Sequence, residues 1–187
     1  KNAAVAIRLH AMTAIPRLET SRLILRQHNP EDFEALHDMW REPAVYRYII
    51  GRPSTREEAW SRLLRYAGHW TLLGYGYWVV EERATGDYIG EMGFADFHRD
   101  IDPPLDDRPE LGWALKAAVH GKGYATEALR AITAWGDAHF VGKETAAIIA
   151  PENSASIRLA EKLGFVKKLE TIYKGAPTLI FHRTPRS

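Results

Sequence analysis

The residues whose types and spacing suggest chemistry lie between Glu110 and Thr126, around a turn that contains two glycines. Gly121 and Gly123 permit backbone angles and a close approach to a ligand that any side chain would block. Lys122, between them, can add a full positive charge. Free N–H groups at a helix N-terminus bind phosphate well, because the helix dipole places partial positive charge there. The pattern predicts an anion site; the alternative is an ordinary glycine-rich connection.

The residues on either side of this turn predict the elements that would position it. Residues 110–115 have a polar start followed by apolar and aromatic residues, as in a buried strand. After the turn, apolar residues recur at helical spacing from Ala125 to Phe140. A strand, a glycine turn and a helix in this order would direct several N–H groups toward one point.

The rest of the sequence predicts one α+β domain over residues 17–187, with a mostly antiparallel sheet and a strand–helix–strand unit in its middle. Strands are expected at residues 20–26, 77–81, 88–94, 145–150, 165–173 and 178–182. Helices are expected at residues 30–40, ended by Pro43; from Ser54 or Thr55, with an apolar face of Trp60, Leu63, Leu64 and Ala67; and from Asn153 or Ser154 to Leu163.

Residues 1–16 are interpreted as an N-terminal extension that is partly flexible. The chain begins with Lys1, and Met12 could open the natural sequence. Residues 1–11 are therefore either an extension or a remnant foreign to the natural chain.

Composition limits the function classes. The 25 Lys and Arg residues balance 24 Asp and Glu residues, so no basic field argues for nucleic acid. The absence of cysteine excludes disulfides and thiol nucleophiles, and it agrees with a cytoplasmic protein. No apolar run approaches a membrane span. The eight His residues lack metal-ligand spacing, so no metal site is expected.

Two motifs carry a resemblance to a known family. The segment HGKGYATEAL, from His120 to Leu129, resembles the acyl-CoA pyrophosphate loop of the GNAT superfamily of N-acetyltransferases. That family's pattern, Gln/Arg-x-x-Gly-x-Gly/Ala, is met by Gly123 and Ala125, with His120 at the Gln/Arg position. NSAS at 153–156, followed by KLGF at 162–165, is similar to the second motif. The opening residues 18–26 resemble the branch that includes ribosomal-protein N-terminal (alanine/serine) acetyltransferases, and the resemblance runs from 17 to 183.

This resemblance implies a splayed sheet with acetyl-CoA in its wedge. The backbone of Trp113, Ala114 and Leu115 would pair with the pantetheine arm, as an added strand does. Asn153, with Ser156 beside it, would contact the pantetheine or its thioester end. His120 would be either a phosphate contact or a surface residue. The N–H groups that would hold the pyrophosphate belong to Gly121, Lys122, Gly123, Tyr124, Ala125 and Thr126.

The expected chemistry is direct acetyl transfer to a primary amine in a ternary complex, because no cysteine is available for a covalent route. Glu110 is the favoured general base, with Glu91 and Asp96 as competitors; each can also be a structural carboxylate. Many family members protonate the leaving thiolate with a tyrosine, but Ala160 stands there in this chain. Ser156 could donate instead, or serve only the packing or capping of its helix.

The acceptor is open between a protein N-terminus and a small-molecule amine. The first two helices and the last hairpin would form its groove by family analogy. The oligomeric state is open between monomer and homodimer, because exposed strand edges can pair.

Two other function classes match parts of the sequence. One is a non-enzymatic acyl-CoA-binding or sensor module, motivated by Ala160. The other is a nucleotide-binding enzyme, which the sequence disfavours. Thr126 stands where a dinucleotide fold needs its third glycine, and Lys122 is followed by glycine rather than the Ser or Thr of a P-loop.

Overall fold

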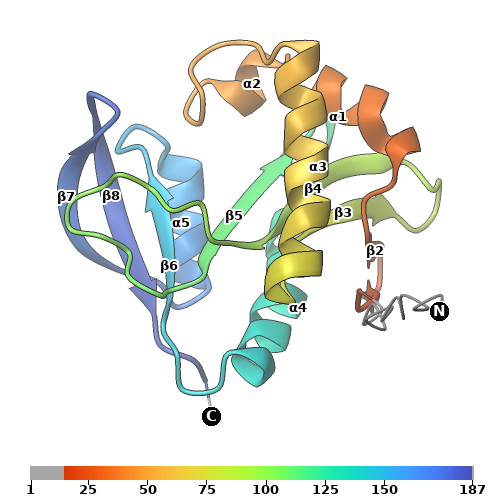
Figure 1. Cartoon of the computed structure of the whole chain (residues 1–187). Coiled ribbons are helices and arrows are strands. Elements are labelled where there is room, and N and C mark those ends of the chain that lie inside the picture. Colours follow the sequence, from red (N-terminus) through yellow and green to blue (C-terminus); the bar gives the residue numbers. More distant parts are fainter. Residues whose placement is uncertain (1–14, 187) are drawn as a thin grey trace, which may run out of the picture.

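The computed structural model describes residues 15–186 and shows one eight-stranded sheet with helices on both faces (Figure 1). The strand order is β1-β2-β3-β4-β5-β6-β8-β7. All neighbours are antiparallel except β5 and β6, which are parallel. This confirms the predicted mixed fold with its mostly antiparallel sheet. Residues 1–14, which make up most of the predicted extension, lie outside the described residues.

The elements follow one another in the order that the sequence predicts, with three short additions: the strand β1, the helix α2 and the 3₁₀ turn that follows β5. The strands are β1 Leu18–Glu19, β2 Leu23–Arg26, β3 Tyr77–Glu82, β4 Tyr88–Ala95, β5 Glu110–Leu115, β6 Thr145–Ile149, β7 Val166–Tyr173 and β8 Ala176–Arg183. The helices are α1 Phe33–Met39, α2 Pro43–Tyr46, α3 Arg56–Leu73, α4 Tyr124–His139 and α5 Ser154–Lys162, with 3₁₀ turns at Pro30–Asp32 and Ala117–Val119.

Helix α3 begins where the sequence predicts, because Thr55 and Glu58 cap each other. The Glu58 N–H donates to the Thr55 hydroxyl (3.2 Å), and the Thr55 N–H donates to the Glu58 carboxylate (2.9 Å). The predicted apolar face of α3 is wrong in part, since Trp60 is 40% and Leu64 51% exposed. The buried positions follow the 3.6-residue period one step away: Ala59, Leu63, Tyr66 and Trp70.

Two other boundaries differ in part from the prediction. The first helix ends before Pro43, as predicted, but Pro43 also opens the unpredicted α2, where a residue without an N–H fits the first turn. The strand predicted from residue 20 begins only at Leu23. Residues 20–22 turn aside because each hydrogen-bonds to the Glu127 carboxylate.

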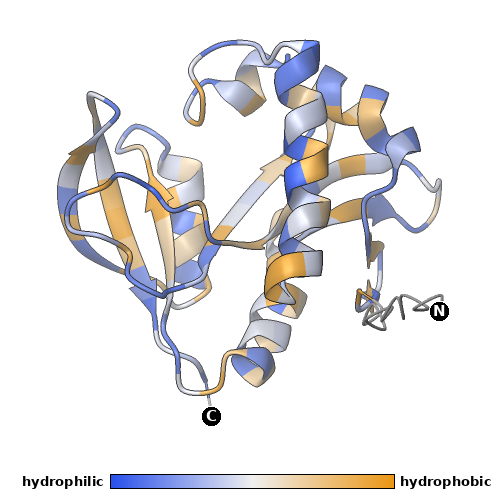
Figure 2. Cartoon of the chain, viewed as in Figure 1, coloured by the Kyte–Doolittle hydropathy of each residue, from blue (hydrophilic) through white to orange (hydrophobic). Residues whose placement is uncertain are grey.

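The sheet has a hydrophobic core on each face. Helices α4 and α5 cover one face, hereafter the α4–α5 face, where Trp78, Phe94 and Ile132 are almost fully buried. Helices α1 to α3 cover the other, the α1–α3 face, where Leu36 and Val79 are fully buried. Burying one such side chain stabilises the fold by about 1.5–3 kcal/mol. Figure 2 shows the corresponding hydrophobic stretches on β6 and β8 and the hydrophilic loop between β4 and β5.

Candidate active site

Strands β5 and β6 separate almost as soon as they meet. Their parallel pairing consists of one register pair, Glu110 with Ala146, and the Ala146 N–H donates to the Pro109 carbonyl (3.0 Å). Beyond this point a cleft of about 510 Å³ opens between β5, the glycine turn and α5. Trp113, Ala114 and Leu115 line its first part. A cleft of this size is typical of a small-molecule or cofactor site.

The backbone of β5 presents alternate residues to this cleft. The Lys116 N–H donates to the Ile89 carbonyl (2.9 Å), so even-numbered residues bond toward β4. Because backbone groups alternate along an antiparallel pair, the N–H and C=O groups of Trp113 and Leu115 point the other way, toward β6. Trp113 and Leu115 are thus the residues whose backbone groups could pair with an extended ligand in the cleft. Ala114, which the sequence analysis placed with them, contributes its side chain to the lining.

The glycine turn leads into a helix whose N-terminus has no capping side chain, as expected. Gly121 (φ +76°) and Gly123 (φ +80°) both occupy the left-handed region, which a side chain would strain. Helix α4 starts at Tyr124, and its N-cap, Gly123, has no side chain that could satisfy the first N–H groups. Gly121, Gly123, Ala125 and Thr126 all line the cleft. A phosphate group at this end would therefore meet unpaired donors and the positive end of the helix dipole.

Glu127, in the first turn of α4, ties this turn to the start of β2. Its carboxylate accepts hydrogen bonds from the Thr20 hydroxyl (2.6 Å), the Ser21 hydroxyl (3.0 Å), the Arg22 N–H (2.9 Å) and Arg22 Nε (2.7 Å). Burial raises the pKa of Glu127, but the hydrogen bonds from Thr20 and Arg22 outweigh it and lower the pKa to about 2. Arg22 Nη1 also donates to the Lys122 carbonyl (2.9 Å). Sequence reasoning missed this anchor, because its partners lie a hundred residues away along the chain.

The side chains of two residues in the predicted phosphate loop have other partners, and that of a third is exposed. His120 Nε2 faces the Leu115 carbonyl at 2.8 Å, so that ring nitrogen carries the proton and donates to the strand. The Tyr124 hydroxyl donates to Glu82, and its ring lies beneath the Arg22 guanidinium. Lys122 is exposed. The geometry thus favours backbone groups, rather than the His120 ring, as the donors to a phosphate.

Helix α5 brings Asn153 and Ser156 to the cleft wall opposite β5. Asn153 caps the helix by accepting from the Ser156 N–H (3.2 Å). The indole N–H of Trp113 donates to Ser156 Oγ (3.2 Å), which leaves the serine hydroxyl hydrogen free to donate. Ala160 is fully buried one turn further on.

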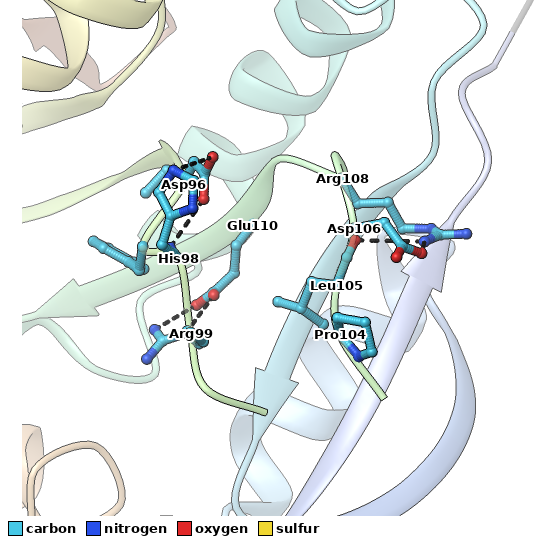
Figure 3. Close-up of a pocket in the computed structure, with 10 residues that line it drawn as sticks. Asp96, His98, Arg99, Pro104, Leu105, Asp106, Arg108 and Glu110 are labelled. Carbon is cyan, nitrogen blue, oxygen red and sulfur yellow. Dashed lines mark hydrogen bonds and ion pairs between the residues drawn. The ribbon is translucent and has the colours of Figure 1, made fainter. Parts of the chain in front are cut away.

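Glu110 lies at the closed end of the wedge, and it does not line the cleft. Both its oxygens accept from Arg99, from Nε (2.5 Å) and from Nη2 (2.7 Å), and Arg99 Nη1 donates to the Tyr173 hydroxyl (3.2 Å). Figure 3 shows this pair at the rim of a smaller hollow of about 210 Å³. Asp96 lines the same hollow and faces His98 at 3.4 Å.

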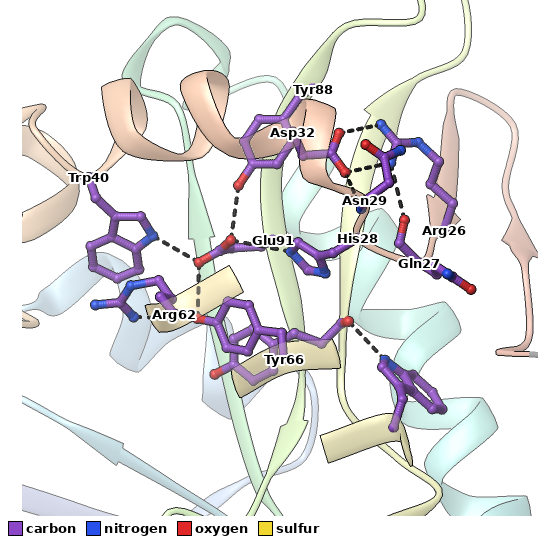
Figure 4. Close-up of polar contacts among 12 residues, drawn as sticks. Arg26, Gln27, His28, Asn29, Asp32, Trp40, Arg62, Tyr66, Tyr88 and Glu91 are labelled. Carbon is purple, nitrogen blue, oxygen red and sulfur yellow. Dashed lines mark hydrogen bonds and ion pairs between the residues drawn. The ribbon is translucent and has the colours of Figure 1, made fainter. Parts of the chain in front are cut away.

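Glu91, the other competitor for the role of base, is fully buried on the α1–α3 face. Four side chains surround its carboxylate: Trp40 (2.8 Å), Tyr66 (2.9 Å), Tyr88 (3.0 Å) and His28 (3.4 Å) (Figure 4). Burial raises the pKa of Glu91, but the hydrogen bonds from His28 and Trp40 and the charges of His28 and Arg62 together outweigh burial and hold the pKa below its usual value. With both oxygens occupied, Glu91 has no access to a substrate and serves as a structural anchor.

The structure adds cleft residues that sequence reasoning missed. Val45, Tyr48 and Ile49 reach it from α2 and the segment that follows. Arg158 and Lys162 line it from α5, one helical turn apart, and that spacing was a readable signal. Among residues 15–186, no group of three or more His, Asp or Glu side chains could hold a metal ion. No helix in the described part of the chain is long and apolar enough to cross a membrane.

The splayed sheet, the cleft and the uncapped glycine turn define an acetyltransferase fold, and comparisons with known proteins agree. Residues 22–166 match the family model described as the acetyltransferase (GNAT) domain. The chain belongs to the GNAT family and is an acetyltransferase.

Individual relatives give the same result. The chain is 31% identical to the uncharacterized N-acetyltransferase YoaA of Bacillus subtilis over 157 residues, which cover 82% of this chain and 84% of YoaA. A solved structure from Bordetella pertussis, assigned to GnaT-family acetyltransferases, superposes with a TM-score of 0.80 at 32% identity and covers 90% of this chain and 99% of that one. RimL, a ribosomal L7/L12 N-terminal acetyltransferase solved with coenzyme A, shares the fold alone (TM-score 0.72, 15% identity, 92% and 98% coverage).

Proposed function

We propose that the cleft binds acetyl-CoA and that the chain transfers the acetyl group directly to a primary amine in a ternary complex. The observation that carries this proposal is the continuity of the cleft from the unpaired β5 backbone at Trp113 to the uncapped N-terminus of α4. An extended arm with a pyrophosphate at one end and a thioester at the other has this shape. GNAT proteins use acetyl-CoA as co-substrate, and the RimL neighbour was solved with coenzyme A.

The residues present fit such a ligand along its whole length. Trp113 and Leu115 offer strand-like backbone pairing to the pantetheine, although the Leu115 carbonyl already accepts from His120. Backbone groups of residues 121–126 would hold the pyrophosphate. Arg158 and Lys162 add positive charge along the α5 wall, which suits the remaining phosphate of coenzyme A.

The chemistry follows from the donors beside the splay point. The Trp113 N–H is the first unpaired donor beyond the single β5–β6 pair, so it can stabilise the oxygen that gains charge when an amine adds to the thioester carbonyl. Ser156 can donate a hydrogen bond from its hydroxyl to the sulfur as the carbon–sulfur bond breaks and the thiolate leaves, because Trp113 occupies its acceptor side. The amine loses a proton in the same sequence, so a base or a water chain must take it.

We propose Glu110 as the base, although its carboxylate is paired with Arg99. Arg99 holds both its oxygens, so the carboxylate acts through a water molecule at the rim or after the pair has opened. Glu110→Gln is therefore expected to lower kcat more than the affinity for acetyl-CoA. An unchanged pH–rate profile would remove Glu110 from the mechanism.

The decisive experiment measures thiol release from acetyl-CoA with a panel of amines: alanine- and serine-initiated peptides, spermidine, free amino acids and aminoglycosides. Intersecting initial-rate patterns are expected for direct transfer, whereas parallel lines would indicate a covalent intermediate. Ser156→Ala should lower kcat, and Ser154→Ala, an exposed serine two residues earlier, is the matched control. A chain that neither binds acetyl-CoA nor releases thiol with any amine would refute the proposal.

A further inference from the structure

Three residues opposite one another on β3, β4 and β5 form an unusual row on the α1–α3 face. Tyr77 pairs with Gly93, and Gly93 pairs with Gly112. The two glycines leave the sheet surface bare beside the tyrosine. A Cβ atom on Gly93 would lie 2.5 Å from the Tyr77 Cα, so the strands here approach more closely than any side chain allows.

The Tyr77 side chain crosses this bare surface and reaches β5. A Cβ atom on Gly112 would lie 1.9 Å from the Tyr77 hydroxyl oxygen and 3.1 Å from its Cζ. The phenol therefore lies directly over Gly112, the residue that precedes Trp113 and the proposed oxyanion donor. Among residues 15–186, no group hydrogen-bonds to the Tyr77 hydroxyl, whereas the neighbouring Tyr66 hydroxyl donates to Glu91.

The ring of Tyr77 is held rigidly. It stacks on the Tyr66 ring with centroids 4.4 Å apart and planes 9° from parallel, and Phe97 packs edge-on at 6.4 Å. Tyr66 is in turn fixed by its hydrogen bond to Glu91 (2.9 Å). A buried carboxylate thus positions one tyrosine, and that tyrosine positions the second.

The two faces of the sheet carry different side chains at the splay point, where β5 separates from β6. A thioester that pairs with β5 as an added strand lies near the plane of the sheet, so an amine must approach it from one face of the sheet or the other. On the α4–α5 face, the Trp113 indole N–H is hydrogen-bonded to Ser156 Oγ. On the α1–α3 face, the Tyr77 hydroxyl is next to Gly112, and Glu110 shares this face two residues away along β5.

We propose that Tyr77 contacts the acceptor amine, its hydroxyl oxygen accepting a hydrogen bond from the amine N–H and holding the nitrogen over the thioester on the α1–α3 face. No proton passes to Tyr77 in this arrangement; it directs the nitrogen lone pair, and the proton leaves toward Glu110 or water. This inference rests on the proposed function and deepens it, because it names a side chain that positions the acceptor nitrogen over the thioester.

The protonation state of Tyr77 agrees with this role. Burial raises its pKa well above the usual value, and the nearby Tyr66 and Glu110 raise the pKa further. The phenol therefore stays neutral near pH 7. The oxygen of a neutral hydroxyl can accept a hydrogen bond from an N–H group.

Tyr77→Phe tests the proposal, since it removes the hydroxyl and retains the stacked ring. The KM of the most active panel amine should rise about five- to tenfold, the loss expected for one hydrogen bond. The KM for acetyl-CoA and the melting temperature should stay within error of wild type. The control is Tyr75→Phe, because that ring packs against Phe140 on the α4–α5 face. An unchanged amine KM in Tyr77→Phe, or an equal rise in Tyr75→Phe, would overturn the proposal.

A second measurement does not need the acceptor. In protein labelled with ¹³Cζ tyrosine, the Tyr77 resonance is identified by its loss in Tyr77→Phe. Acetyl-CoA should shift this resonance more than coenzyme A does, because only acetyl-CoA places an acyl group at Gly112. If acetyl-CoA shifts the Trp113 indole resonance but leaves Tyr77 unmoved, the placement of Tyr77 is refuted even though the cleft binds acetyl-CoA. If neither resonance moves and no thiol is released, the proposed function fails.

Discussion

Replacing Glu91 with Gln is expected to destabilise the fold strongly, although the two side chains have nearly the same shape. The Glu91 carboxylate accepts from Trp40 and Tyr66 at one oxygen and from Tyr88 and His28 at the other. A glutamine amide has only one oxygen. Its NH₂ group would face two buried donors that have lost their acceptor.

The size of the effect follows from those two donors. Each buried donor without an acceptor costs about 1–3 kcal/mol, and relaxation of the tyrosine hydroxyls recovers part of it. We expect Glu91→Gln to lower the free energy of unfolding by about 2–4 kcal/mol, a large part of the roughly 5–15 kcal/mol typical of a domain.

Urea unfolding at pH 7, followed by tryptophan fluorescence, measures this difference through the transition midpoint. Glu57→Gln is the matched control, because Glu57 is exposed on the first turn of α3 and should change stability by less than about 0.5 kcal/mol. If Glu91→Gln and Glu57→Gln unfold at the same urea concentration, the four hydrogen bonds do not contribute as argued.

The pH dependence gives an independent check on Glu91. Its folded-state pKa lies below the ordinary value of 4.5, because the hydrogen bonds from His28 and Trp40 and the charges of His28 and Arg62 together outweigh burial. A group with a depressed folded pKa stabilises the fold above its unfolded pKa and loses that contribution as the pH falls through the folded value. The stability gap between wild type and Glu91→Gln should therefore shrink as the pH falls below about 4.5.

The remaining predictions concern the glycine turn and two helical glycines. Glu127→Gln should weaken acetyl-CoA binding, measured by calorimetry, because it removes the ion pair with Arg22 that helps to tie the turn to the start of β2. The pKa of about 2 means that acid has the same effect only well below pH 4.5. Gly68→Ala should raise the free energy of unfolding by about 0.5–1 kcal/mol, seen as a higher melting temperature, since a Cβ at this position in α3 meets nothing within 4 Å. Gly136→Ala should lower the free energy of unfolding by about 1–2 kcal/mol. Alanine favours a helix here as it does at position 68, but its Cβ would lie 2.7 Å from the Phe94 ring.

The sequence predicted the fold well where local chemistry determines structure. The strand from Glu110, the two left-handed glycines and the helix after them are one continuous segment, and the Thr55–Glu58 capping box spans four residues. Such signals involve neighbours in the chain and can be read from the order of residues alone.

Predictions that depend on distant partners were less reliable. The strand predicted at residue 20 gives way to hydrogen bonds with Glu127, more than a hundred residues later. Glu110 was predicted as a base from its place on the strand, and nothing local announces that Arg99 from the preceding loop holds both its oxygens. The catalytic role of Glu110 stays a prediction.

The row of Tyr77, Gly93 and Gly112 shows why such a site escapes sequence reasoning. Each glycine taken alone lowers the preference of its segment for a strand. Placed opposite each other by the register of three strands, the two glycines make room for one phenol ring. That ring brings a hydroxyl with no hydrogen-bond partner among residues 15–186 to the point where β5 leaves β6. A methyl group at Gly112 would overlap the hydroxyl, so the glycine serves the position of the tyrosine rather than the flexibility of β5.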